Sequence, residues 1–252
     1  MEAPLLAGLD PLTVVTGIAV CFFAAALGGV AGMGSGMIIT LFLLPVVGPK
    51  ALVPVMSVLM LFNTSSRLWF YRHSLVRERV LPIAVVAIPM SGLGALLYVR
   101  LEGALIQVLL GAILLGSVPL RRWTERRRLA PGSATMIAAS GVYGFLSSVI
   151  VGAGILLLPM LMGFGLAGPA LLATDAAISV LVNIAKVIFF GKLDALSAEL
   201  FVLALAMGLI TIPGTWAGVW VVRHTPLRVH TLLIEGLIAL GGLSMIWGGL
   251  RA

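Results

Sequence analysis

The chain has 252 residues, of which 61% are hydrophobic and only 10% are charged, and its mean hydropathy is +1.18. A soluble domain of this length could not cover so much apolar surface with so few charged side chains, and the apolar runs are continuous rather than alternating as in a membrane β-barrel. The composition therefore predicts an all-α polytopic membrane protein, and places the formal net charge of +7 in loops between spans rather than on a nucleic-acid-binding surface.

The first apolar stretch, residues 12–45, is too long for a single crossing of the bilayer. As one helix it would extend roughly 51 Å at 1.5 Å per residue, whereas the hydrocarbon layer is ~30 Å thick. The small-residue break GMGSG at 32–36 turns it into a hairpin, residues 12–47, with arms at 12–31 and 36–47. The spans that we expect after this hairpin are 51–71, 80–99 and 103–120.

The second part of the chain has the same order of elements. A basic linker, residues 121–132, leads into a second hairpin at 133–163, which turns at VGAG, residues 151–154. The expected spans after it are 169–190, 197–222 and 231–249. The arms after the breaks are short, so each hairpin either crosses the bilayer fully or contains a re-entrant half-helix; the sequence leaves both open.

Basic residues gather in the loops of one predicted side, at 72–79, 121–130 and 223–230. These loops hold Arg72, Arg77, Arg79, Arg121, Arg122, Arg126, Arg127, Arg128, Arg223 and Arg228. The other side holds only Lys50, Arg100, Lys192 and Arg251. Because cytoplasmic loops carry the excess of Lys and Arg, this distribution predicts a multi-pass protein of the cytoplasmic (inner) membrane with its N-terminus outside.

An internal repeat relates residues 12–120 to residues 133–250. Gly34 and Gly36 match Gly152 and Gly154, and Asn63 matches Asn183 at nearly the same spacing. Each half has a Gly-broken helical hairpin plus three transmembrane helices, which is an odd number of crossings, so the second half must run opposite to the first. Two inverted-topology repeats are typical of secondary transporters, whose sites lie at broken helices near the midplane.

These duplicated segments resemble the sulfite exporter TauE/SafE family, also called the toluene-sulfonate uptake permease family. The resemblance rests on GMGSGMIITLFLLP with FNTSSRLWFYRHSL, and on VGAGILLLP with VNIAKVIFFGKLDAL. It implies a transporter or exporter of small sulfur-containing anions, such as sulfite, sulfonates or related organosulfur anions. Ser35 and Ala153 stand where family members often carry glycine.

The helix breaks are the first candidate substrate-binding elements. A helix that begins inside the membrane exposes unpaired backbone N–H groups and the positive end of its dipole, which together attract an anion. The residues concerned are Gly34, Ser35, Gly36, Gly152, Ala153 and Gly154. The alternative is that the glycines serve only a tight turn or close helix packing.

Polar residues inside the spans are the second set of candidates. Asn63 and Arg67 share one face of the helix at 51–71, and Asn183 and Lys186 share one face of the helix at 169–190. We expect them to contact the anion. The alternatives are plain interhelical hydrogen bonds for the amides, and snorkelling of the two cations toward the headgroups.

Asp175 is the proton-coupling candidate, because it is an acid deep in a predicted span; alternatively, it balances the charge of Lys186. No catalytic residues, metal site or cofactor are expected. The expected partners are a small anionic substrate and the lipid bilayer, with homo-oligomerisation possible. Two other functions stay open: transport of another small anion such as a carboxylate, and a non-transporting membrane scaffold.

Overall fold

The computed structural model of the protein describes residues 10–31, 34–126, 133–222 and 246–247. Nearly all of these residues are helical, and no strand occurs among them, which confirms the all-α class. The helices are α1 (Pro11–Ala31), α2 (Ser35–Val47), α3 (Pro49–Tyr71), α4 (Arg77–Arg100), α5 (Gly103–Arg126), α6 (Ser133–Val149), α7 (Gly154–Gly163), α8 (Gly168–Lys192) and α9 (Ala198–Val222), with a 3-10 turn at Arg72–Ser74.

Helix α5 departs most from the predicted bounds. It continues to Arg126 and so enters the segment that was predicted as a linker from residue 121. The physical reason is local: residues 121–126, RRWTER, contain no glycine or proline, and arginine and glutamate favour the helix. The predicted span at 231–249 lies almost entirely outside the described residues.

Five of the described helices are long and apolar enough to cross a membrane, so the chain is a multi-pass membrane protein. The two arms that follow the breaks are not among them. Helix α2 has 13 residues and α7 has 10, or roughly 20 Å and 15 Å of length against ~30 Å of hydrocarbon. These lengths favour the re-entrant alternative for both arms.

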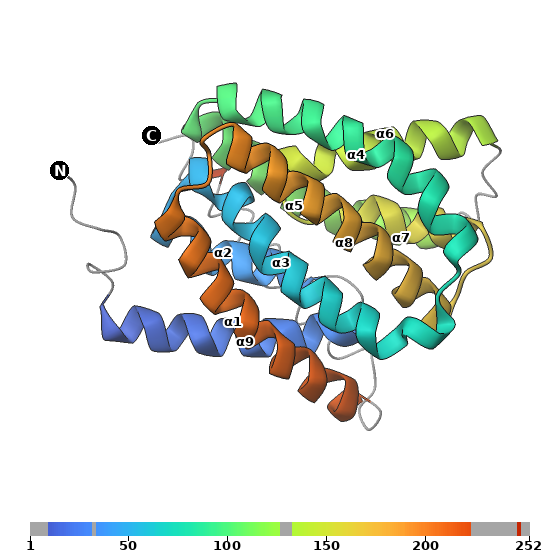
Figure 1. Cartoon of the computed structure of the whole chain (residues 1–252), viewed down its shortest axis with the longest axis horizontal. Helices are drawn as coiled ribbons and strands as arrows, with labels where there is room; N and C mark the ends of the chain where they lie inside the picture. Colours follow the sequence, from blue (N-terminus) through green and yellow to red (C-terminus); the bar gives the residue numbers. More distant parts are fainter. Residues whose placement is uncertain (1–9, 32–33, 127–132, 223–245, 248–252) are drawn as a thin grey trace.

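Helices α3 and α8 pack against each other in antiparallel orientation (Figure 1). At one end the Val76 amide, just after α3, donates a hydrogen bond of 3.3 Å to Thr174 Oγ1, near the start of α8. At the other end Lys50, near the start of α3, lines one cavity together with Leu193, just after α8. The two helices on which the polar candidates lie therefore form one pair.

The first arm of each hairpin packs against a helix of the other half. Helix α1 lies along α9, and α6 lies along α4. Glycines permit both contacts: a Cβ on Gly218 would run into the Ala26 backbone, and a Cβ on Gly144 would run into the Ala87 backbone. Such small-residue contacts let helices pack closely in lipid. The reciprocal pairing agrees with two related halves, although the inverted repeat stays a prediction.

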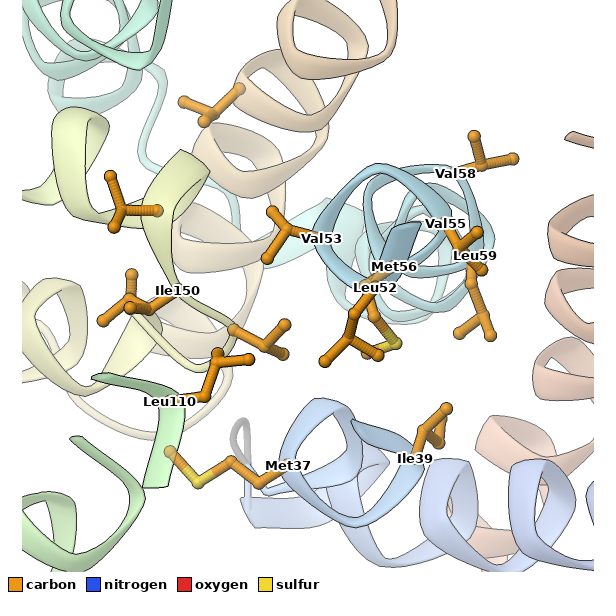
Figure 2. Packing of buried hydrophobic residues seen from close by; sticks show 14 of the residues in the cluster. Met37, Ile39, Leu52, Val53, Val55, Met56, Val58, Leu59, Leu110 and Ile150 are labelled. Carbon is orange, nitrogen blue, oxygen red and sulfur yellow. The ribbon is translucent and has the colours of Figure 1, made fainter. Parts of the chain in front are cut away.

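The apolar core lies around α2 and α3, where Met37, Ile39, Leu52 and Met56 are buried (Figure 2). The outer helix faces carry large apolar side chains such as Trp220, which is 72% exposed. In lipid this exposure has no hydrophobic cost, so the helices are held together by close packing and polar contacts in the interior. Polar groups buried at the centre of the bundle therefore mark where its function lies.

Candidate functional site

Both hairpins turn at a glycine whose backbone is in the left-handed region. Gly34 has φ of 100° and the matching Gly152 has φ of 95°. Glycine adopts these angles without the steric cost that a Cβ brings. Each hairpin thus turns at one glycine with a positive φ.

The two breaks touch each other, although they are far apart along the chain. A Cβ on Gly36 would lie 3.4 Å from Val151 Cγ1, and a Cβ on Gly152 would lie 2.5 Å from Met37 Cε. Side chains of one break therefore pack directly on the backbone of the other. The two hairpin tips meet in the interior of the bundle.

A cavity of about 110 Å³ lies where the breaks meet α3, α6 and α8. At roughly 30 Å³ for each water molecule in the liquid, this is the volume of about four water molecules. Every residue that the sequence singled out for the site lines it, namely Gly34, Ser35, Gly36, Asn63, Arg67, Gly152, Ala153, Gly154, Asp175, Asn183 and Lys186.

Two helix N-termini are directed to this cavity. Helix α2 begins at Ser35 and α7 begins at Gly154, and neither N-terminus is capped by the side chain of its N-cap residue, Gly34 or Ala153. The first-turn N–H groups of a helix have no partner within it, and they carry the positive end of the dipole. The cavity is thus lined by backbone donors that suit an anion.

Asn63 supplies a further donor. Its side chain is buried, and its Oδ1 lies 3.5 Å from Ser35 Oγ, which donates to it. Its Nδ2 has no hydrogen-bond partner among the described residues. An unsatisfied buried donor is costly, and it is unusual in folded proteins. A ligand with acceptor oxygens in the cavity would satisfy it.

Arg67 and Asp175 form a buried ion pair that joins α3 to α8. Arg67 Nη2 lies 2.5 Å from Asp175 Oδ2, and the residues are 4% and 2% exposed. Snorkelling to the headgroups is therefore wrong for Arg67. The balance of Asp175 by Lys186 is also wrong, because the carboxylate is paired with the arginine of the other half. This pair could not be predicted from the sequence, because its partners are 108 residues apart.

Lys186 is in a different position from Arg67. Its side chain lines the cavity and is 7% exposed, so snorkelling is wrong here too. Within the part of the chain that the structure describes, its ammonium makes no hydrogen bond or ion pair. A buried ammonium without a counter-charge is strongly unfavourable in a membrane interior. An anion in the cavity would supply that counter-charge.

Several residues that line the cavity were not predicted from the sequence to belong to the site. Tyr143 and Ser147 of α6 reach the cavity, and the Tyr143 hydroxyl lies 3.4 Å from Ser179 Oγ. Their spacing of four residues on one helix face could have revealed them. Met37, Met56 and Met60 also line it. Met37 and Met56 are part of the buried core as well.

Comparison with known proteins places this arrangement in a family. The family model described as "Sulfite exporter TauE/SafE" matches residues 17–245, which include every residue of the cavity lining. The resemblance noted in the sequence is thereby confirmed. No curated protein and no solved structure matches the chain.

Proposed function

This chain belongs to the sulfite exporter TauE/SafE family, and from that premise we propose that it carries a small sulfur-containing anion, sulfite or a sulfonate, through the cavity between its two helix breaks. The family makes it a membrane transporter. The identity of the anion and its route through the bundle are the proposal.

This proposal rests on one observation: several hydrogen-bond donors that have no acceptor or counter-charge in the described part of the chain line the same buried cavity. They are the uncapped N-termini of α2 and α7, the unpartnered Nδ2 of Asn63, and the Lys186 ammonium, which has no partner among the described residues. Each is unfavourable without a partner in a membrane interior, and an oxyanion in the cavity would supply acceptors and a negative charge. Asn183 lines the same cavity from α8 and adds a second amide.

Transport proceeds by alternating access of the two halves. The cavity lies between helices of both halves, so motion of one half against the other would expose it first to one side and then to the other. The Arg67–Asp175 ion pair joins a helix of one half to a helix of the other. It therefore has to break when the two halves move apart at this point. A proton on Asp175 would weaken the pair, which keeps this residue as the proton-coupling candidate.

The direction is outward across the cytoplasmic membrane, with the N-terminus outside. The arginine-rich end that includes Arg72, Arg77 and Arg79 then lies in the cytoplasm, as the positive-inside rule requires. An inside-negative potential drives an anion outward by about 2.3 kcal/mol per charge per 100 mV. Export therefore needs no coupling ion.

We propose transport rather than catalysis for the same site. Among the described lining residues Asp175 is the one acid, and Arg67 already engages it. A membrane-embedded enzyme would need a nucleophile with a base in reach, or a pair of titratable groups, facing the substrate. No homo-oligomer is needed to complete the cavity, because one chain supplies its whole described lining.

The test is transport by the purified protein in proteoliposomes with an imposed membrane potential. Sulfite, methanesulfonate and acetate are loaded separately, and the expected result is potential-driven movement of the sulfur anions well above that of acetate. Preference for acetate would assign the site to carboxylates instead. Movement of none of the three would reject the transporter of small anions and favour a scaffold.

The paired substitution of Asn63→Leu with Asn183→Leu probes the site itself. We expect it to abolish transport of the sulfur anions, because both amides are lost from the cavity lining. Ser140→Ala is the matched control, since Ser140 is a buried polar residue of α6 that bonds to its own helix at Met136 O and does not line the cavity. Equal transport by both variants would contradict the proposed site.

A further inference from the structure

The charged groups of the cavity do not cancel. Its described lining contains three of them: Arg67, Asp175 and Lys186. Arg67 and Asp175 form an ion pair at 2.5 Å and so contribute no net charge. Lys186 is left over, so the lining has one net positive charge when the amine of this lysine is protonated.

We propose that this cavity selects anions with a single negative charge, and that Asp175 is the residue that sets the selectivity. The inference rests on the proposed function, in which the cavity holds the transported anion. A monoanion brings the total charge of the cavity and its contents to zero. A dianion leaves one negative charge uncompensated in a buried site within the membrane, where unbalanced charges are costly.

The helix N-termini do not alter this count. The start of each helix carries roughly half a positive charge, which attracts an anion of either kind, but the opposite charge at its far end leaves each helix with no net charge. The N–H groups of α2 and α7 therefore donate hydrogen bonds to any oxyanion, whether it has one charge or two. What distinguishes the two kinds of anion is the side-chain charge.

The net positive charge arises because Asp175 in the second half has no acidic counterpart in the first half. When Asn63 is matched to Asn183, Asp175 of α8 corresponds to Val55 of α3, which is fully buried. The cation of the first half, Arg67, thus has a carboxylate from the second half. The cation of the second half, Lys186, has no such carboxylate from the first.

The volume of the cavity and the residues that line it narrow the class of ligand further. A cavity of about 110 Å³ suits an ion of a few non-hydrogen atoms rather than an aryl sulfonate with its ring. The thioethers of Met37, Met56 and Met60 in its lining offer soft, polarisable contact to a methyl group or a sulfur atom. The ligand chemistry is therefore a small alkyl sulfonate or hydrogen sulfite.

Three molecules of nearly equal shape test the charge rule: dimethyl sulfone, methanesulfonate and sulfate carry zero, one and two negative charges. Binding to the purified full chain in detergent is measured by calorimetry. We expect methanesulfonate to bind at least tenfold more tightly than either of the others. In Asp175→Asn, where the lining gains a net positive charge, the preference shifts at least tenfold toward sulfate.

Two variants separate charge from structure. Asp175→Asn leaves Arg67 without its carboxylate and could impair folding, whereas Arg67→Gln with Asp175→Asn removes the whole pair and keeps one positive charge. The double variant should retain the wild-type preference for methanesulfonate. Asp194→Asn, which changes an exposed acid just after α8, is the matched control and should also retain it.

The outcomes are distinct. Binding of sulfate as tight as that of methanesulfonate to the wild type, or an unchanged preference in Asp175→Asn, overturns the charge rule and leaves the anion site standing. Equal binding of dimethyl sulfone overturns it as well. If none of the three binds the folded wild type, the proposed function falls, and this inference falls with it.

Discussion

The two halves of the molecule are alike in backbone and unlike in charge. Gly34 and Gly152 have nearly the same positive φ, 100° and 95°, and each lies at the turn of a hairpin. The cations differ: Arg67 of α3 is held by Asp175, whereas no described residue pairs with Lys186 of α8.

This difference separates two tasks of the site. The shared features, a glycine turn and a short helix that begins inside the bundle, build the cavity from both halves. The unshared acid decides how much positive charge remains in it. Substitution of the two turn glycines should therefore change the stability of the protein similarly. Substitution of the two cations should change it differently.

The largest expected contrast in stability is between Arg67→Gln and Lys186→Gln. Loss of Arg67 leaves Asp175 buried without a counter-charge, which costs about 3–5 kcal/mol. Loss of Lys186 removes a buried ammonium that has no partner among the described residues, so the unliganded protein should be as stable or more stable. Chemical unfolding in detergent without added anion measures both.

Controls for this contrast lie on the same two helices or next to them. Arg72→Gln changes an exposed arginine just after α3, and Lys192→Gln changes an exposed lysine at the end of α8. Both should leave the free energy of unfolding near that of the wild type. Equal destabilisation by Arg67→Gln and Lys186→Gln would show that the two cations have the same surroundings.

The next effect concerns the feature that the halves share. Gly152→Ala should destabilise the protein by about 1–3 kcal/mol, because the residue has a positive φ that strains any residue with a Cβ. Gly154→Ala is the matched control, since a Cβ there meets nothing within 4 Å. Thermal unfolding of the two variants compares them.

If Gly34 has the same role in its half, Gly34→Ala should also fall in the range of about 1–3 kcal/mol that backbone strain costs. A loss for Gly152→Ala with none for Gly34→Ala would mean that the two turns are not equivalent. Since Gly34 lies at the N-cap of α2, the same experiment reports whether that helix start depends on the turn.

A smaller effect is expected from substitution of Asn63, the buried amide of the first half. Asn63→Ala removes the unpartnered Nδ2 donor from the cavity, and we expect the apparent affinity for the transported anion to fall about tenfold, equivalent to ~1.4 kcal/mol. Proteoliposome flux over a range of anion concentrations provides the value. An unchanged affinity would remove Asn63 from the site.

The smallest effect belongs to Ser35→Gly. The Ser35 hydroxyl donates to Asn63 Oδ1 over 3.5 Å, which is a long and weak hydrogen bond. We expect the affinity for the anion to change by no more than about threefold, since less than 1 kcal/mol is at stake. A loss as large as that of Asn63→Ala would mean that the hydroxyl itself binds the anion.

The sequence predicted the helices and the membership of the cavity well, for identifiable reasons. Glycine-rich breaks in runs too long for one crossing favour turns, and an Asn in the middle of an apolar helix is costly unless it faces something polar. Those two arguments found Gly34, Gly152, Asn63 and Asn183, and all four line one cavity.

The pairing of charges could not be predicted in the same way. Arg67 and Asp175 lie in different halves, and only the packing of α3 against α8 brings them together. Spacing along α8 could show that Asp175 and Lys186 are too far apart to pair directly, but it could not supply the true partner. Methionines such as Met60 were equally hard to assign, because the same side chain serves packing and cavity lining.

The most direct test of the account is to locate a bound selenium analogue by anomalous diffraction, with selenite in place of sulfite. We expect selenium between Gly34–Gly36 and Gly152–Gly154, with an oxygen within hydrogen-bond distance of Lys186 Nζ. Selenium found instead in the other polar cavity, beside Lys50 and Asp194, with the central cavity empty, would contradict it.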